Sequence, residues 1–206
     1  MYTEAAVQNP RLRAALFAAP IAIATVAALI LHQQGRSWWC KCGSLVPWSF
    51  DIWSSHNSQH FFDPYSFTHL LHGVVLAGVF ALPGLAWAPW KRIPVEARVV
   101  VAVAFESGWE LLENSDLVIQ KYREATISLD YYGDSVLNSV SDITMCALGF
   151  LLASRLGWKA SIALFVAVEL MLLLWIRDNL TINIIMLIWP LDVIKQWQMG
   201  LTPPTP

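Results

Sequence analysis

Long apolar segments limit what this chain can fold into more than any other feature. Residues 14–31 are eighteen nearly uninterrupted apolar positions, close to the roughly 20 residues that a helix needs to cross a bilayer. Lipid offers the backbone no hydrogen bonds, so such a segment is expected to be helical. Further apolar segments occupy residues 67–87, 97–115, 134–154, 160–176 and a short stretch, 180–193, that contains Pro190. The sequence predicts an all-α polytopic membrane helix bundle of five or six transmembrane spans in a single membrane domain, residues 1–206, with 180–193 as a short span or a re-entrant helix.

The composition agrees with a membrane protein. The chain is 56% hydrophobic and only 14% charged, whereas soluble domains are about 25% charged. A net charge of -2, without a run of like charges, gives no basis for a nucleic-acid partner. The expected partners are membrane lipids and, in addition, either a larger membrane complex or further copies of this chain.

Basic residues near the segment ends predict the orientation. No Ala-x-Ala-like cleavage site follows the first apolar segment, so we expect an uncleaved anchor rather than a signal peptide. With a cytoplasmic N-terminus, seven basic residues fall inside against five outside, which the positive-inside rule favours. Residues 33–66, which carry Trp38, Trp39, Trp48 and Trp53 among polar residues, then form a periplasmic loop at the membrane interface.

Acidic residues recur with helical spacing in two neighbouring segments. Glu106, Glu110 and Glu113 are spaced i, i+4, i+7 and share one helix face. The next segment repeats this arrangement with Asp134, Asn138, Ser141 and Asp142. A central carboxylate costs about 2.5–3.5 kcal/mol on membrane-insertion scales, so such residues usually have a function or a partner. The predicted catalytic residues are Glu106, Glu110, Asp134, Asn138 and Asp142.

Each of these residues also has a purely structural alternative. Glu110 could be a buried hydrogen-bond partner of a neighbouring helix, and Glu113 the solvated end of its span. Asp134 could be an N-cap, a position that favours Asp. Gly108, between the acidic residues, is expected to permit a close helix neighbour.

Two histidines open the second apolar segment. His69 and His72 are spaced i, i+3 and therefore occupy adjoining helical positions. Imidazoles placed in this way can bind a divalent metal ion or transfer protons. The predicted metal ligands are His69, His72, Glu110 and Asp142. The alternative is that the histidines lie at the membrane interface or pair with the carboxylates for structural reasons.

Other polar residues are weaker candidates. Arg123 and Arg177 could bind an anionic group, although Glu124 and Asp178 follow them directly and favour surface pairs. Glu169 lies alone within an apolar segment, where it serves either in proton transfer or as a structural hydrogen-bond partner.

The three cysteines do not form a disulfide framework. Cys146 lies in an apolar segment and is expected to serve packing. Cys40 and Cys42 could bind a metal ion or thiol reagents, but two sulfurs do not complete a structural zinc site. We therefore expect no site at this pair.

With these residues identified, the chain resembles an uncharacterised family of alphaproteobacterial multi-pass inner-membrane proteins, and its core resembles the VanZ-like membrane proteins. The second resemblance covers roughly residues 63–149 and rests on Asp63 with His69, on Glu106 or Glu110, on Arg123, and on Asp134 with Asn138. The separations from Asp63 to His69 and from Arg123 to Asp134 are longer than in that family. The resemblance implies the bacterial inner membrane as location and no established reaction.

Two functions are expected from these patterns. The first is an envelope enzyme or binding protein whose site near the outer leaflet acts on a lipid or lipid-linked substrate. As an enzyme it would be a metal-dependent or acid–base hydrolase or transferase at the periplasmic face. The alternative is a non-catalytic accessory or assembly subunit of a larger membrane complex, in which the acidic residues are buried hydrogen-bond partners.

Overall fold

The chain folds into helices joined by loops. The structure is a computed structural model that describes residues 9–86, 90, 93–126 and 131–200. Its helices are α2 (Pro10–Gln33), α3 (Ser66–Ala81), α4 (Pro83–Ala86), α5 (Val95–Glu113), α6 (Asp116–Ala125), α7 (Val136–Leu156), α8 (Trp158–Ile176), α9 (Leu180–Ile188) and α10 (Asp192–Met199). Within these described ranges there is no strand, only one isolated bridge between Trp48 and Phe62, so the all-α prediction is confirmed.

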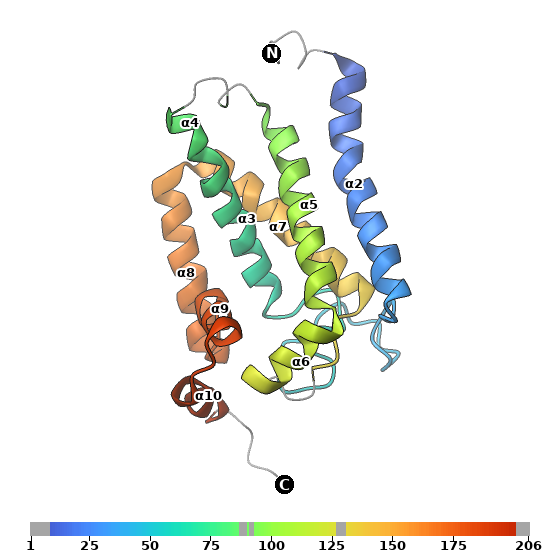
Figure 1. Cartoon of the computed structure of the whole chain (residues 1–206), viewed down its shortest axis with the longest axis vertical. Helices are drawn as coiled ribbons and strands as arrows, with labels where there is room; N and C mark the ends of the chain where they lie inside the picture. The colour runs from blue at the N-terminus through green and yellow to red at the C-terminus, as the bar shows by residue number, and fades with distance from the viewer. Residues whose placement is uncertain (1–8, 87–89, 91–92, 127–130, 201–206) are drawn as a thin grey trace.

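The long helices form a bundle whose polar connections gather at one end. Figure 1 shows α2, α3, α5, α7 and α8 running side by side. Helix α3 packs most closely against α7, and α2 against α5. Helices α6 and α10 and the loop of residues 34–65 lie at the lower end of the view, where α9 also lies beside α8. The starts of α3 and α7 and the end of α5 are therefore brought to this same end.

Among the described residues, three helices are long and apolar enough to cross a membrane: α2, α7 and α8. Only 17% of the most apolar part of α2 and 22% of that of α8 is buried in the protein, against 61% for α7. Helix α7 is therefore the centre of the bundle, while α2 and α8 expose apolar side chains that suit lipid. Helix α3 is apolar but shorter, with 16 residues. Five or six spans and the orientation stay predictions.

Two glycines allow the close contact between α3 and α7. A Cβ on Gly73 would lie 2.0 Å from the carbonyl oxygen of Cys146, and one on Gly149 would lie 1.9 Å from the carbonyl oxygen of Leu70. Any larger residue would force the helices apart. The prediction for Gly108 is wrong, because a Cβ there would meet no atom within 4 Å. Cys146 is fully buried at the contact, as expected for packing.

Proline residues end the helices earlier than the apolar segments suggest. The segment predicted over residues 67–87 breaks at Leu82, and α4 begins at Pro83. Its predicted end at residue 87 lies outside the described residues, as do Lys91 and Arg92, which entered the orientation count. The segment predicted over 180–193 is divided around Pro190 into α9 and α10.

Glu169 has a structural partner at the start of α9. Its Oε1 accepts a hydrogen bond from the backbone N–H of Leu180 at 2.9 Å, and its Oε2 accepts one from that of Thr181 at 3.2 Å. A carboxylate at a helix N-terminus satisfies N–H groups that have no partner within the helix. Of the two alternatives for this residue, the contacts support the structural one.

Candidate functional site

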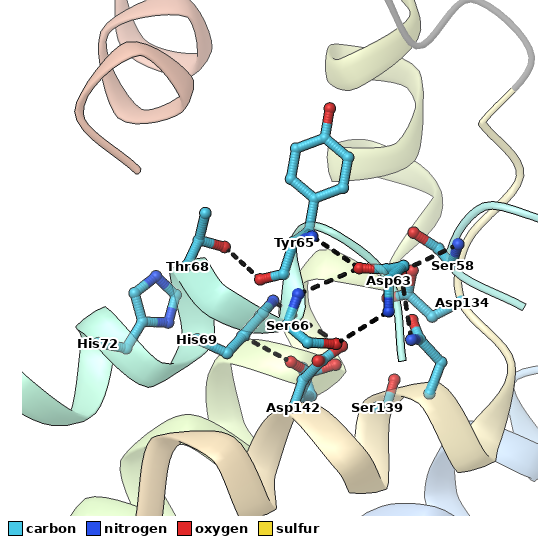
Figure 2. A network of polar contacts seen from close by, with 12 residues as sticks. Ser58, Asp63, Tyr65, Ser66, Thr68, His69, His72, Asp134, Ser139 and Asp142 are labelled. Atoms are coloured by element: carbon cyan, nitrogen blue, oxygen red, sulfur yellow. Dashed lines mark hydrogen bonds and ion pairs between the residues drawn. The ribbon is translucent and has the colours of Figure 1, made fainter. Parts of the chain in front are cut away.

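His69 lies at the centre of a buried cluster formed by α3, α5 and α7. Its Nδ1 is 2.6 Å from Oε1 of Glu106 and 3.3 Å from Oε1 of Glu110. Its Nε2, on the other side of the ring, is 3.9 Å from Oδ2 of Asp142, and Figure 2 shows the ring directed at Asp142 across the gap between α3 and α7. Both ring nitrogens therefore face carboxylates, so the imidazole links the acidic face of α5 to that of α7.

His72 approaches the same carboxylate from the next turn of α3. Its Nδ1 is 2.9 Å from Oε1 and 3.1 Å from Oε2 of Glu106. The two imidazole rings are 4.9 Å apart, so the i, i+3 spacing places them side by side as the sequence predicts, and both contact the carboxylate of Glu106. Both imidazoles thus lie within hydrogen-bonding distance of the one carboxylate of Glu106.

Several buried oxygens beside His69 have no hydrogen-bond partner within the part of the chain that the structure describes. They are both carboxylate oxygens of Glu110, Oδ1 of Asp142, Oε2 of Glu113 and Oγ of Ser141. A buried polar atom without a partner costs about 1–3 kcal/mol, and more when charged. These oxygens therefore call for a proton, water molecules or a cation.

A small cavity adjoins the cluster. Its volume is about 70 Å³, and the residues around it include His69, His72, Glu113, Tyr122, Asp134 and Asp142. About 10–15 Å³ of such volume holds one water molecule, so there is room for an ion with part of its hydration shell. Glu113 is half-buried at this wall and is not simply the solvated end of its helix.

Asp63 organises a second network at the beginning of α3 (Figure 2). Its carboxylate accepts hydrogen bonds from the backbone N–H groups of Ser58, Tyr65 and Ser66 at 3.1, 2.7 and 3.1 Å. The side chain of Asn138 donates to it at 3.3 Å and to the carbonyl oxygen of His60 at 2.9 Å. Burial raises the pKa of Asp63 in spite of these bonds. Asn138 therefore joins α7 to the loop of residues 34–65 rather than to His69.

Asp134 belongs to a third group of polar contacts. Asn114 donates to its Oδ2 at 2.8 Å and accepts from its backbone N–H at 2.7 Å, and the hydroxyl of Tyr131 donates to its Oδ1 at 3.0 Å. The N-cap of α7 is Ser135, whose Oγ accepts from the backbone N–H of Asn138. The N-cap alternative for Asp134 is therefore wrong by one residue.

Two tyrosines of this region escaped the sequence prediction. The hydroxyl of Tyr122 donates to Oδ1 of Asn183 at 3.2 Å and thereby links α6 to α9. Burial raises the pKa of Tyr122 and of Tyr131 well above 10.0, so both are neutral hydrogen-bond donors at physiological pH. Tyr122 borders the cavity from α6, and Tyr131 borders it from the segment before α7. No spacing of acidic residues or histidines in this stretch indicated either tyrosine.

The arginines lie apart from the cavity lining. The guanidinium of Arg123 donates to the carbonyl oxygen of Tyr131. That of Arg177 donates to the carbonyl oxygen of Trp197 at 2.9 Å and lies over its ring. Neither borders the cavity, and their role as anion contacts stays a prediction. Of the predicted residues, the structure unites His69, His72, Glu106, Glu110 and Asp142 in one cluster and places Asp134 and Asn138 in the adjoining networks.

Comparison with known proteins gives one consistent result. Residues 31–200 match the family described as "Protein of unknown function (DUF2585)". A UPF0314 protein of Rhizobium meliloti is 44% identical over 92% of this chain and 93% of its own length. One of Paracoccus denitrificans is 43% identical over 92% of this chain and 95% of its own. No solved structure matches at a significant level. The expected similarity to an alphaproteobacterial family is confirmed, and the VanZ-like resemblance stays a prediction.

Proposed function

The chain belongs to the DUF2585 family of proteins of unknown function, and we propose that it is a multi-pass inner-membrane protein that binds a divalent metal ion at the histidine–carboxylate cluster. One observation carries the proposal. Two imidazoles and the carboxylate of Glu106 converge beside Glu110, which is fully buried and whose oxygens have no hydrogen-bond partner among the described residues. A cation would give these oxygens the partner that they lack.

The donor atoms suit a transition metal ion. His69, His72 and Glu106 each offer one atom, all within 4.8 Å of one another, and His69, Glu110 and Glu113 do the same. Mixed imidazole and carboxylate ligands suit zinc and iron, and carboxylate oxygens also suit manganese. Three protein ligands with an open fourth position are typical of catalytic rather than structural zinc, and the adjoining cavity offers that position.

The chemistry that follows is hydrolysis or group transfer. A bound metal ion would supply a water nucleophile near neutral pH. Asp142, on the far side of the His69 ring, would favour a proton on Nε2 and so leave Nδ1 as the ligand atom. The site lies at the end of the bundle where the polar connections gather. With a cytoplasmic N-terminus this end faces the outer leaflet, which favours a lipid or lipid-linked envelope substrate.

The test is elemental analysis of the protein purified in detergent without chelators. We expect Glu110→Gln to lower the metal content by about one ion per chain relative to the parent. The matched control is Glu124→Gln on α6, where the carboxylate is exposed and bonded only to Gln120 among the described contacts. It should keep the parent's metal content. Equal metal in the parent and in a folded Glu110→Gln variant would reject the metal site.

The accessory-subunit alternative predicts a different result. In that case the cluster is structural, Glu110→Gln leaves the metal content unchanged, and the protein migrates with a large complex on a native gel after gentle solubilisation. A small homogeneous species that loses about one metal ion per chain on this substitution would exclude a purely structural cluster.

A further inference from the structure

The loop of residues 34–65 brings two cysteines and two histidines together, away from the site described above. Cys40, Cys42, His56 and His60 each offer one ligand atom, and the four atoms lie within 4.8 Å of one another. In the described part of the chain this loop has no helix or ladder of its own beyond the single bridge. Long loops without secondary structure are uncommon in compact domains, so this one needs another source of order.

The distances match a tetrahedral zinc site. Sγ of Cys40 lies 3.3 Å from Nδ1 of His56, and Sγ of Cys42 lies 3.6 Å from Nε2 of His60. With zinc–sulfur and zinc–nitrogen bonds of about 2.3 and 2.05 Å, a tetrahedral angle separates the two ligand atoms by about 3.5 Å. An ion can therefore enter between the pairs with little movement of the side chains.

The surroundings of the ligands are those that a bound metal requires. The backbone N–H of Cys42 donates to Sγ of Cys40, and that of Ser44 donates to Sγ of Cys42, both at 3.4 Å. Each sulfur thus already accepts a backbone hydrogen bond of the kind that orients metal ligands. Nδ1 of His60 lies 2.5 Å from the carbonyl oxygen of Val46, and a proton held there leaves Nε2 free as a ligand.

We propose that Cys40, Cys42, His56 and His60 bind a structural zinc ion that fixes this loop across the polar end of the bundle. Four protein ligands complete the coordination and leave no open position, which is typical of structural zinc. Both sulfurs are free thiols, and Cys42 is exposed, so an ion has access from solvent.

Hydrogen bonds join this loop directly to the start of α7, one of the helices that carry the histidine–carboxylate cluster. The carbonyl oxygen of His60, a ligand residue, accepts from Asn138 on α7 at 2.9 Å. Gln59 donates to the carbonyl oxygen of Gly133 at 2.8 Å. The carbonyl oxygen of Ser58 accepts from Ser135 at the N-cap of α7 at 2.9 Å. Loss of the ion would loosen this end of the bundle while leaving the spanning helices intact.

Cobalt substitution tests the site independently of the proposed function, because of the two proposed ligand sets this one alone includes sulfur. We expect Co²⁺ added to metal-free parent protein to give a thiolate-to-metal charge-transfer band in the near ultraviolet and intense visible bands of tetrahedral cobalt. Cys42→Ser should lose most of the charge-transfer intensity. Cys146→Ser, which removes the buried sulfur on α7, and Glu110→Gln should both retain it.

If the Cys42→Ser variant does not fold, a second measurement on the parent protein tests the site. The parent purified without chelator should contain zinc that a thiol-specific mercurial releases to a metal-binding dye, at about one ion per chain. Folded parent protein that releases no zinc and shows no charge-transfer band would overturn the proposal. So would an intact mass showing a disulfide between Cys40 and Cys42 in protein isolated from the membrane.

Discussion

Asp178 shows how a single buried carboxyl can make stability depend on pH. It lies between α8 and α9, where its carboxylate accepts from the hydroxyl of Tyr65 at 3.2 Å and from the backbone N–H of Asn179 at 2.9 Å. Burial raises its pKa from 3.8 to about 6, although these bonds lower it. The folded protein therefore holds the proton of Asp178 more tightly than the unfolded chain does.

Because the pKa of this acid is raised in the folded protein, its contribution to stability must decrease as the pH rises. Its contribution to stability is fully present below pH 4 and is lost as pH rises through 6, by at most about 3 kcal/mol. We expect the free energy of unfolding of the parent, relative to that of Asp178→Asn, to fall over this interval and to level off above it. Denaturant unfolding in detergent at several pH values measures this difference. The control is Asp192→Asn at an exposed position of α10, whose free energy of unfolding should vary with pH as that of the parent does. A difference in free energy of unfolding between parent and Asp178→Asn that stays constant with pH would contradict the expectation.

At the scale of single residues, the sequence predicted which side chains share a helix face, but not which residues of other helices they contact. The spacing of Glu106 and Glu110 predicted a shared helix face, and both contact His69. The convergence of His69 and His72 on one oxygen of Glu106 depends on how α3 and α5 are placed, which no spacing within one helix reports. Cys40 and Cys42 alone do not complete a zinc site, but His56 and His60 lie in the same loop at i, i+4 spacing and offer the other two ligand atoms.

Between elements, the contact of α3 with α7 depends on the absence of a side chain at Gly149. Leu70, whose carbonyl oxygen occupies the space of a Cβ there, is adjacent to His69. We expect Gly149→Ala to destabilise the fold by about 1–3 kcal/mol, the usual cost of overpacking a close contact. It should also weaken metal binding at the cluster, because α3 must move away from Asp142. Thermal unfolding in detergent and metal content together measure both effects.

The control for this substitution is Gly108→Ala on α5. Its Cβ meets no atom within 4 Å, and Ala favours a helix by about 1 kcal/mol over Gly. This variant should be as stable as the parent or slightly more so. If both glycine variants unfold at the same temperature as the parent, the close contact between α3 and α7 does not contribute to the stability of the fold.

The helices themselves could be predicted more fully than their contacts. Apolar length and flanking polar residues located α2, α5, α7 and α8 to within a few residues. Proline explains the divided segments, because Pro83 and Pro190 lack the N–H that helix continuation requires. Which glycine faces a neighbour could not be predicted, since Gly73, Gly108 and Gly149 all lie within helices and only the packing distinguishes them.

At the scale of the whole molecule, both proposed metal sites lie at one end of the bundle. Helix α7 connects the two ends, because the loop of residues 34–65 bonds to its start and the turn at Gly157 follows its last residue. If α7 spans the membrane, this loop and this turn lie on opposite sides. A cytoplasmic N-terminus places the loop and the histidine–carboxylate cluster outside.

Accessibility to a membrane-impermeant maleimide tests this orientation. Leu45 in the loop is 89% exposed and Trp158 at the turn is 71% exposed, so cysteine at either position leaves the core untouched. We expect Leu45→Cys to react in spheroplasts above the labelling of the parent's own thiols. Trp158→Cys should react above that level only after lysis. The reverse pattern would place the cluster on the cytoplasmic side and would exclude an envelope substrate at the outer leaflet. Reaction of both variants in spheroplasts would show that α7 does not span the membrane.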